Sequence, residues 1–187
     1  MCRMSRVKTM SAALAVVVVT IGCADTPPLE ERGVLGAGFR YSAYGPDYDP
    51  GPAYWARVGR EMAVRFEGAV PETIWIVSSL QGDGTRLHFP LAESYPLITG
   101  SEDDVNEAAL DLFDGLGFRV WLQVEPGHAP IEKLIHLVLG RYDHHPSVIG
   151  FGVDVEWYQS TTKPEGKAVT DAEAEAWLAA VRSHDPE

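Results

Sequence analysis

Short apolar runs alternate with segments of helical period along the chain from residue 34 onward. The short runs are rich in β-branched and aromatic residues, and the longer segments repeat apolar residues every three or four positions. This alternation is typical of βα units that form a mostly parallel sheet. We count four such units, which predicts an α/β fold. The strands are expected at residues 38–45, 73–80, 118–125 and 148–158.

Each predicted strand is followed by a predicted helix. The helices are expected at residues 53–66, between a weak Ser101/Asp104 capping box and Gly115, from Pro130 onward, and at 171–183 behind an N-cap at Thr170. The apolar stripes expected to be buried are Trp55, Val58, Met62 and Phe66 in the first helix, Val105, Ala108, Ala109, Leu112 and Phe113 in the second, and Ile131, Leu134, Ile135 and Val138 in the third. Residues 81–100, rich in Gly and Pro, are expected to form a loop.

The number of units limits the architecture. A (β/α)8 TIM barrel needs eight units in about 250 residues, whereas this chain supplies four. Two readings are open: a small open α/β sheet, or the N-terminal half of a TIM barrel that belongs to a longer protein. We favour the half barrel, and assign it to residues 36–187.

The first residues have the layout of an export signal. Three basic and no acidic side chains precede an apolar run at residues 10–22, which ends in a small residue before Cys23. The run is shorter than the roughly 20 residues that a transmembrane helix needs. We therefore expect residues 1–22 to be removed as a signal peptide.

Residues 20–23 (Thr-Ile-Gly-Cys) resemble the lipobox of bacterial lipoproteins. The resemblance implies that Cys23 carries the lipid anchor of an exported protein held at the cell envelope. An ordinary secretory signal with an incidental cysteine is the alternative. Residues 23–35, which contain two prolines and few bulky apolar groups, are expected to tether the domain to the membrane.

Charge and cysteine content exclude several classes of function. Loss of residues 1–22 removes three basic side chains and leaves 12 Lys and Arg against 27 Asp and Glu, a net charge of −15 with His neutral. Nucleic acid is therefore not expected as a partner, because its phosphates would be repelled. Cys2 and Cys23 are the only cysteines, so the domain has no disulfide. No cofactor or metal is expected.

Alternation along the third and fourth strands separates two faces. Apolar side chains are expected under the helices: Val120, Leu122 and Val124 on the third strand, and Phe151, Val153 and Val155 on the fourth. The remaining side chains are expected to point into the barrel: Trp121, Gln123 and Glu125, and Gly150, Gly152, Asp154 and Glu156.

Three carboxylates, Glu125, Asp154 and Glu156, therefore converge at the C-terminal ends of neighbouring strands, where α/β enzymes keep their active sites. Carboxylates buried together have separated pKa values, so one can act as a general acid while another stays ionised. Glycoside hydrolysis uses such a pair. The alternative is a structural network that ties the strands together or binds a cation.

Aromatic residues near the same rim could stack on sugar rings. They are Tyr41, Tyr44, Trp75, Trp157 and Tyr158, and with Gln123 they make up the candidate sugar contacts. Trp75 and Trp121 are expected to fill the core or the barrel rather than to bind ligand.

The segment His145-Pro146-Ser147-Val148-Ile149, followed by GFGVDVE, resembles the approach to the fourth strand in the large clan of retaining (β/α)8 glycoside hydrolases, which includes β-galactosidases and many cellulases. The resemblance implies that Glu156 is the general acid/base. The family has Asn before this Glu, and this chain has Val155. The family's nucleophile lies on the seventh strand, beyond the four units present.

Residues 152–158 (GVDVEWY) also resemble the fourth strand of chitinase-like barrels. Asp154, Glu156 and Trp157 match that pattern in kind, and Tyr158 stands where its catalytic Glu would be. The two resemblances agree on the architecture and differ on which residue is the acid.

Two other functions remain open: a surface lipoprotein that binds carbohydrate without cleaving it, and the solute-binding lipoprotein of a transporter. Among the histidines, His128 follows the third strand and is placed for function. Asp143, His144 and His145 precede the fourth strand, away from the expected active edge, so no metal site is predicted there.

Overall fold

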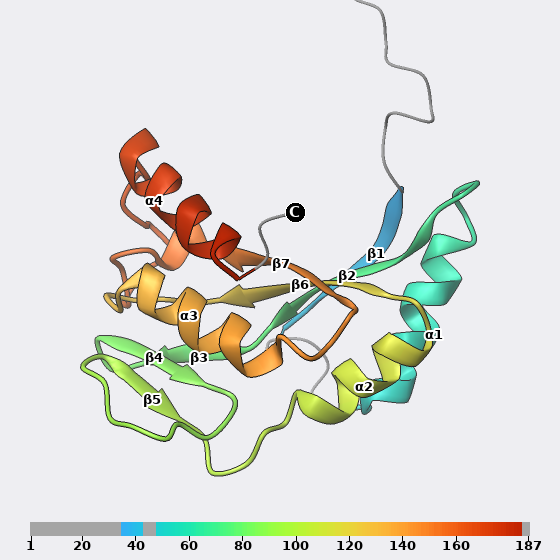
Figure 1. Ribbon diagram of the computed structural model, residues 1–187, viewed down its shortest axis with the longest axis horizontal. Helices are drawn as coiled ribbons and strands as arrows, with labels where there is room; N and C mark the ends of the chain where they lie inside the picture. Colours follow the sequence, from blue (N-terminus) through green and yellow to red (C-terminus); the bar gives the residue numbers. More distant parts are fainter. Residues whose placement is uncertain (1–34, 43–47, 185–187) are drawn as a thin grey trace, which may run out of the picture. The chain divides into compact units, whose positions relative to one another are not determined.

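The computed structural model describes residues 35–42 and 48–184, and Figure 1 shows its ribbon. The predicted signal peptide, the predicted lipid site Cys23, the tether up to residue 34 and Tyr44 lie outside these residues. Within the described part, no helix is both long enough and apolar enough to cross a membrane.

Four parallel strands form the main sheet. They are β1 (Gly36–Tyr41), β2 (Val70–Ile76), β6 (Arg119–Val124) and β7 (Val148–Val153), and they lie side by side in that order. Every neighbouring pair is parallel, and a helix lies between each of these strands and the next one in the chain. The predicted α/β fold with a mostly parallel sheet is confirmed.

Four helices share one apolar core with the sheet: α1 (Pro52–Ala63), α2 (Glu107–Gly115), α3 (Ile131–Tyr142) and α4 (Asp171–Arg182). In Figure 1, α1 and α2 lie together at one end of the sheet, and α3 and α4 lie together at the other. The predicted stripe of α3 is confirmed, because all four of its apolar residues are buried. Thr170 caps α4, and Glu173 completes the capping box.

A second, smaller sheet follows β2 and changes two predictions. The predicted strand at residues 73–80 is two strands, because β2 ends at Ile76 and β3 (Ser78–Gln81) belongs to the second sheet. The predicted loop contains β4 (Gly84–Leu87), antiparallel to β3, and β5 (Ile98–Gly100), parallel to β4. Gly82, with φ of 57°, makes the tight turn between β3 and β4. Strands of three or four residues are too short to show an alternation of apolar and polar side chains, so the sequence pattern did not predict them.

The two faces of the main sheet differ in exposure. Val120, Leu122 and Val124 have no exposed surface, whereas Trp121 between them is 37% exposed. The same alternation in β2 leaves Ile74 38% exposed beside buried Thr73 and Trp75. We call the side that the helices do not cover the open face, and it consists of Arg40, Glu72, Ile74, Arg119, Trp121, Gln123, Gly150 and Gly152.

Two predicted helix stripes are partly wrong. In α1 the buried residues are Ala56, Gly59 and Ala63, while Met62 is 37% exposed and Phe66 lies beyond the helix end. Gly59 determines which face of α1 is turned towards the sheet, because a Cβ at this position would lie 2.6 Å from the ring of Phe118. The face of α1 that carries the small residues therefore packs on the sheet.

Helix α2 begins later than its predicted capping box. Its first residue is Glu107, and Asn106 holds the N-cap position. Val105 precedes the helix and is 64% exposed, although the predicted stripe included it. The carboxylate Oδ1 of Asp104 instead accepts from the backbone N–H groups of Asn106 and Glu107.

Asn106 links the sheet, α2 and α3 through buried hydrogen bonds. Its Oδ1 accepts from Trp75 Nε1 at 3.0 Å, and its Nδ2 donates to the carbonyl oxygen of His88 and to Tyr142 Oη at 3.2 and 2.9 Å. The residue is 1% exposed. Removing this amide would leave a buried donor and buried acceptors without their partner, which costs free energy.

We predict that Asn106→Ala lowers the free energy of unfolding by about 2–4 kcal/mol, since it combines unmet hydrogen bonds with a small cavity. Val105→Ala, at the exposed neighbouring position, is the matched control and should change it by less than about 0.5 kcal/mol. Denaturant unfolding measures both. Equal effects of the two substitutions would contradict the role of Asn106.

Candidate functional site

The C-terminal edge of the main sheet brings together two of the predicted carboxylates. Glu125 directly follows β6, and Asp154 directly follows β7, which pairs with β6. The backbone N–H of Asp154 donates to the carbonyl oxygen of Val124 at 2.9 Å, so the pairing extends up to both residues. Both residues are buried, at 2% and 8% exposure. The backbone N–H of Glu125 donates to Ser78 Oγ at 2.8 Å.

An arginine from the first strand spans this edge. Arg40 Nη2 donates to Asp154 Oδ2 at 2.6 Å, and Arg40 Nε donates to Gln123 Oε1 at 2.8 Å. One guanidinium therefore joins β1, β6 and β7 across the open face. Gln123 and Asp154 were predicted site residues, and Arg40 was not. The sequence did contain a signal for Arg40. It lies between Phe39 and Tyr41 in a predicted strand, so alternation places its side chain on the face opposite to theirs.

Glu156 lies beyond the end of β7. The strand stops at Val153, and the chain turns into the short 3-10 helix η2 (Val155–Trp157). Val155 is 53% exposed, so its predicted place under the helices is wrong. The reason is local: the N–H of Trp157 donates to the carbonyl oxygen of Asp154, which ends the extended backbone. Glu156 is exposed to solvent two residues after Asp154.

Two predicted sugar contacts are engaged in packing. Tyr41 stacks on Trp75, with ring centroids 3.9 Å apart, on the side of β1 opposite to Arg40. Trp75 belongs to the core, as expected. Tyr158 is buried and its hydroxyl donates to Glu173 Oε1 at 2.8 Å. The pKa of Tyr158 is raised to about 12, mainly by burial and next by this hydrogen bond.

Trp157 and His128 remain near the sheet's C-terminal edge. Trp157 is partly buried on η2. His128 is exposed, and its Nδ1 lies 3.1 Å from Gln159 Oε1, while its backbone N–H donates to the carbonyl oxygen of Asp83. These contacts join the β3–β4 turn to the segments that follow β6 and β7.

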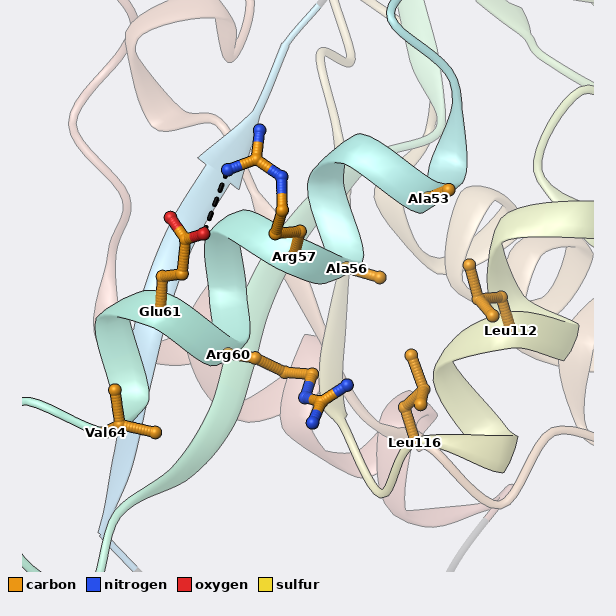
Figure 2. A pocket seen from close by; sticks show the side chains of 8 residues that line it. All are labelled: Ala53, Ala56, Arg57, Arg60, Glu61, Val64, Leu112 and Leu116. Atoms are coloured by element: carbon orange, nitrogen blue, oxygen red, sulfur yellow. Dashed lines mark hydrogen bonds and ion pairs between the residues drawn. The ribbon is translucent and has the colours of Figure 1, made fainter.

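Two hollows on the surface are lined by residues other than these carboxylates. Figure 2 shows a hollow of about 420 Å³ between α1 and α2, with the Arg57–Glu61 ion pair at its rim. Its remaining lining is mostly apolar: Ala53, Ala56, Val64, Leu112 and Leu116, together with Arg60. A second hollow, of about 260 Å³, lies over β1 and β2 and includes Arg40, Glu72 and Ile74. The second hollow opens on the same face as the Arg40 network.

Comparisons of the chain with protein-family models, with curated proteins and with solved structures gave no match.

We predict a measurable coupling between Arg40 and Asp154. In a double-mutant cycle of Arg40→Met and Asp154→Asn, the coupling free energy should be about 0.5–1.5 kcal/mol, because Asp154 is largely buried while the Arg40 side chain is 42% exposed and partly screened. The exposed Arg57–Glu61 pair on α1 is the matched control, with about 0.3–0.5 kcal/mol expected. A coupling no larger than that of the control pair would show that the Arg40 bridge does not hold this edge.

Proposed function

We propose that the chain is the N-terminal half of a glycosidase-like TIM barrel in an exported, lipid-anchored envelope protein that acts on polysaccharide. In this proposal Glu156 is the general acid/base, and Asp154 and Glu125 orient it. Gln123 and Trp157 contact the sugar. The single observation that supports it most is the arrangement of Glu125 and Asp154 at the C-terminal edge of two adjacent parallel strands.

The winding of the sheet supports the barrel. In a TIM barrel each parallel strand pairs with the next one in sequence, and the helices cover only the outer face. The order β1-β2-β6-β7 follows this rule, and the helices share their core with one face. The open face would then line the barrel interior. Gly150 suits that position, since a Cβ there would lie 2.4 Å from the ring of Trp121, which already fills the space.

The lipid anchor rests on the sequence alone, through the basic and apolar N-terminal segment and the lipobox-like residues before Cys23. A solute-binding transporter component is less well supported, because such proteins have two lobes and residues 34–187 form one compact unit.

A second candidate is a non-catalytic protein that binds carbohydrate at the same edge. The ion pair between Arg40 and Asp154 favours it, since Asp154 Oδ2 is engaged by Arg40 at 2.6 Å rather than by the proposed acid Glu156. Val155, where the glycoside hydrolase pattern has Asn, favours it as well. Gln123 and Arg40 would then serve as polar contacts for sugar hydroxyls.

Replacing Glu156 separates the two candidates. In the complete protein, Glu156→Gln should lower the turnover of its glycan by about 10²–10⁴-fold, because it removes general acid/base catalysis and preserves the side chain's shape. Glycan affinity, measured by calorimetry, should stay unchanged. Glu165→Gln, at an exposed loop position, is the matched control and should change neither quantity.

Undiminished turnover in Glu156→Gln would contradict the catalytic role. Glycan binding by the unsubstituted protein without hydrolysis would support the second candidate instead. A protein that neither binds nor cleaves any of a panel of bacterial and plant polysaccharides would contradict both.

A further inference from the structure

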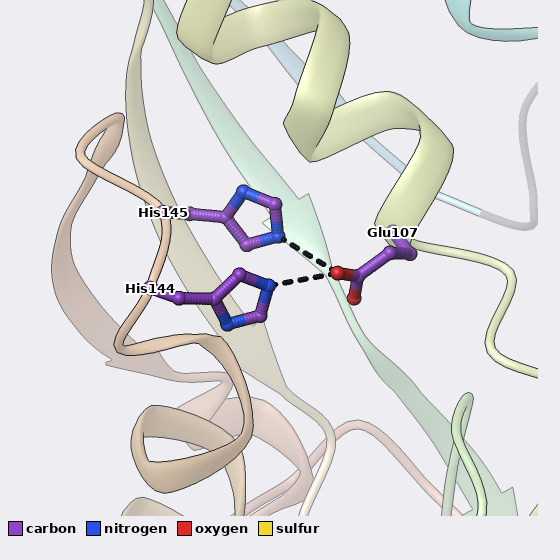
Figure 3. Close-up of side chains that lie close together, drawn as sticks. All are labelled: Glu107, His144 and His145. Carbon is purple, nitrogen blue, oxygen red and sulfur yellow. Dashed lines mark hydrogen bonds and ion pairs between the residues drawn. The ribbon is translucent and has the colours of Figure 1, made fainter.

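Two histidines and a glutamate converge at the edge of the sheet opposite to the candidate site. His144 and His145 lie in the loop between α3 and β7, and Glu107 is the first residue of α2. Figure 3 shows both imidazoles pointing at one carboxylate. The Nε2 atoms of His144 and His145 lie 2.7 and 3.5 Å from Glu107 Oε1. One donor atom from each of the three residues lies within 4.8 Å of the other two.

The second nitrogen of His145 is fixed by a carboxylate. His145 Nδ1 lies 2.7 Å from Asp114 Oδ2, and the other oxygen of Asp114 accepts from the backbone N–H of Ser147 at 2.9 Å. Asp114 accepts from the Ser147 N–H with one oxygen and faces His145 Nδ1 with the other, and a carboxylate only accepts, so Nδ1 carries the proton. His145 therefore directs the lone pair of Nε2 at Glu107.

Two polar atoms in this cluster have no hydrogen-bond partner among the described residues. They are His145 Nε2 and Glu107 Oε2, and both are buried. The His145 side chain is 1% exposed, so water does not solvate its ring. A bare imidazole nitrogen that faces a carboxylate oxygen at 3.5 Å sets lone pair against lone pair. A cation between the two atoms would remove this conflict.

We propose that His144, His145 and Glu107 bind a divalent transition metal ion of the zinc class. Two imidazole nitrogens and one carboxylate oxygen form a donor set that zinc prefers, and the carboxylate–histidine contact from Asp114 is the usual support of a metal-bound imidazole. Bonds of about 2.0–2.2 Å in tetrahedral geometry separate neighbouring donors by about 3.3–3.6 Å. The separation of His145 and Glu107 already matches this value, and the half-exposed His144 ring needs only a small rotation.

One divalent ion can contact all three donors of this cluster. The two imidazole rings lie with their centroids 4.1 Å apart, and their Nε2 atoms both face Glu107 Oε1. The imidazoles select against Mg²⁺ and Ca²⁺, which prefer oxygen ligands. Since the ligands come from α2 and from the α3–β7 loop, the metal would hold these two segments together.

The test measures binding of Zn²⁺ to the full chain, prepared without a tag and with Cys2→Ser and Cys23→Ser in every sample so that no thiol competes. Calorimetry should give one Zn²⁺ per chain, Zn²⁺ should raise the melting temperature, and Mg²⁺ should do neither. His144→Ala should weaken Zn²⁺ binding by about tenfold or more, and Asp114→Asn by about 10–100-fold. Co²⁺ should give the visible absorption bands of a tetrahedral site, and His144→Ala should abolish them.

The matched control is His136→Ala. His136 Nδ1 lies 2.9 Å from His184 Nε2, so these residues form a second imidazole pair elsewhere on the surface. The substitution should leave Zn²⁺ stoichiometry and affinity unchanged. Because His144 is exposed, its replacement leaves the core intact, and circular dichroism of His144→Ala verifies the fold. No Zn²⁺ binding, or binding that His144→Ala preserves and His136→Ala removes, would overturn the proposal.

Discussion

Alternation of side chains along β2 and β6 divides the molecule into a core side and an open side. Val120, Leu122 and Val124 lie under the helices with no exposed surface, and Trp121 and Gln123 point the other way. A shift of one residue would send the apolar set to the open face, so burial of the core fixes the strand register. That register decides which residues reach the C-terminal edge. The candidate site therefore depends on the packing of the core.

The two edges of the sheet hold their acidic residues in different ways. At the C-terminal edge, Asp154 is paired with Arg40, and on the open face Glu72 accepts from Trp121 Nε1 and pairs with Arg119. Each of these carboxylates has a cation close by. At the opposite edge, Glu107 and Asp114 face imidazoles instead. A chain with a large excess of acidic residues thus places some of them where arginine, or a histidine-bound metal, offsets their charge.

Local sequence patterns predicted the regular parts of the fold. Strand β6 and helix α3 follow directly from period-two and period-3.6 apolar spacing, and α4 follows from its Thr170 cap. The end of β7 was predicted too late, because Val155 and Trp157 continue the strand-like composition while the backbone turns at Asp154. The alternation of apolar residues does not report that turn.

Contacts between distant segments set the limit on predicting the sites. Glu125 and Asp154 could be placed together, since parallel strands end at one edge. The meeting of Glu107 with His144 and His145 depends on how the start of α2 packs against the α3–β7 loop, which the local sequence pattern does not determine. The α1 stripe shows the same limit: Gly59 lets the helix approach the rings of Phe39 and Phe118, and this close contact outweighs its larger apolar residues.

The two-sided character of the sheet is tested most directly by thiol labelling of adjacent positions on β2. With Cys2→Ser and Cys23→Ser as background, Ile74→Cys should react with a water-soluble thiol reagent in the folded chain of 187 residues, because this position is 38% exposed. Thr73→Cys, at a position 1% exposed, should react only on unfolding. Equal labelling rates at the two positions in the folded state would contradict an open face, and with it the placement of the candidate site.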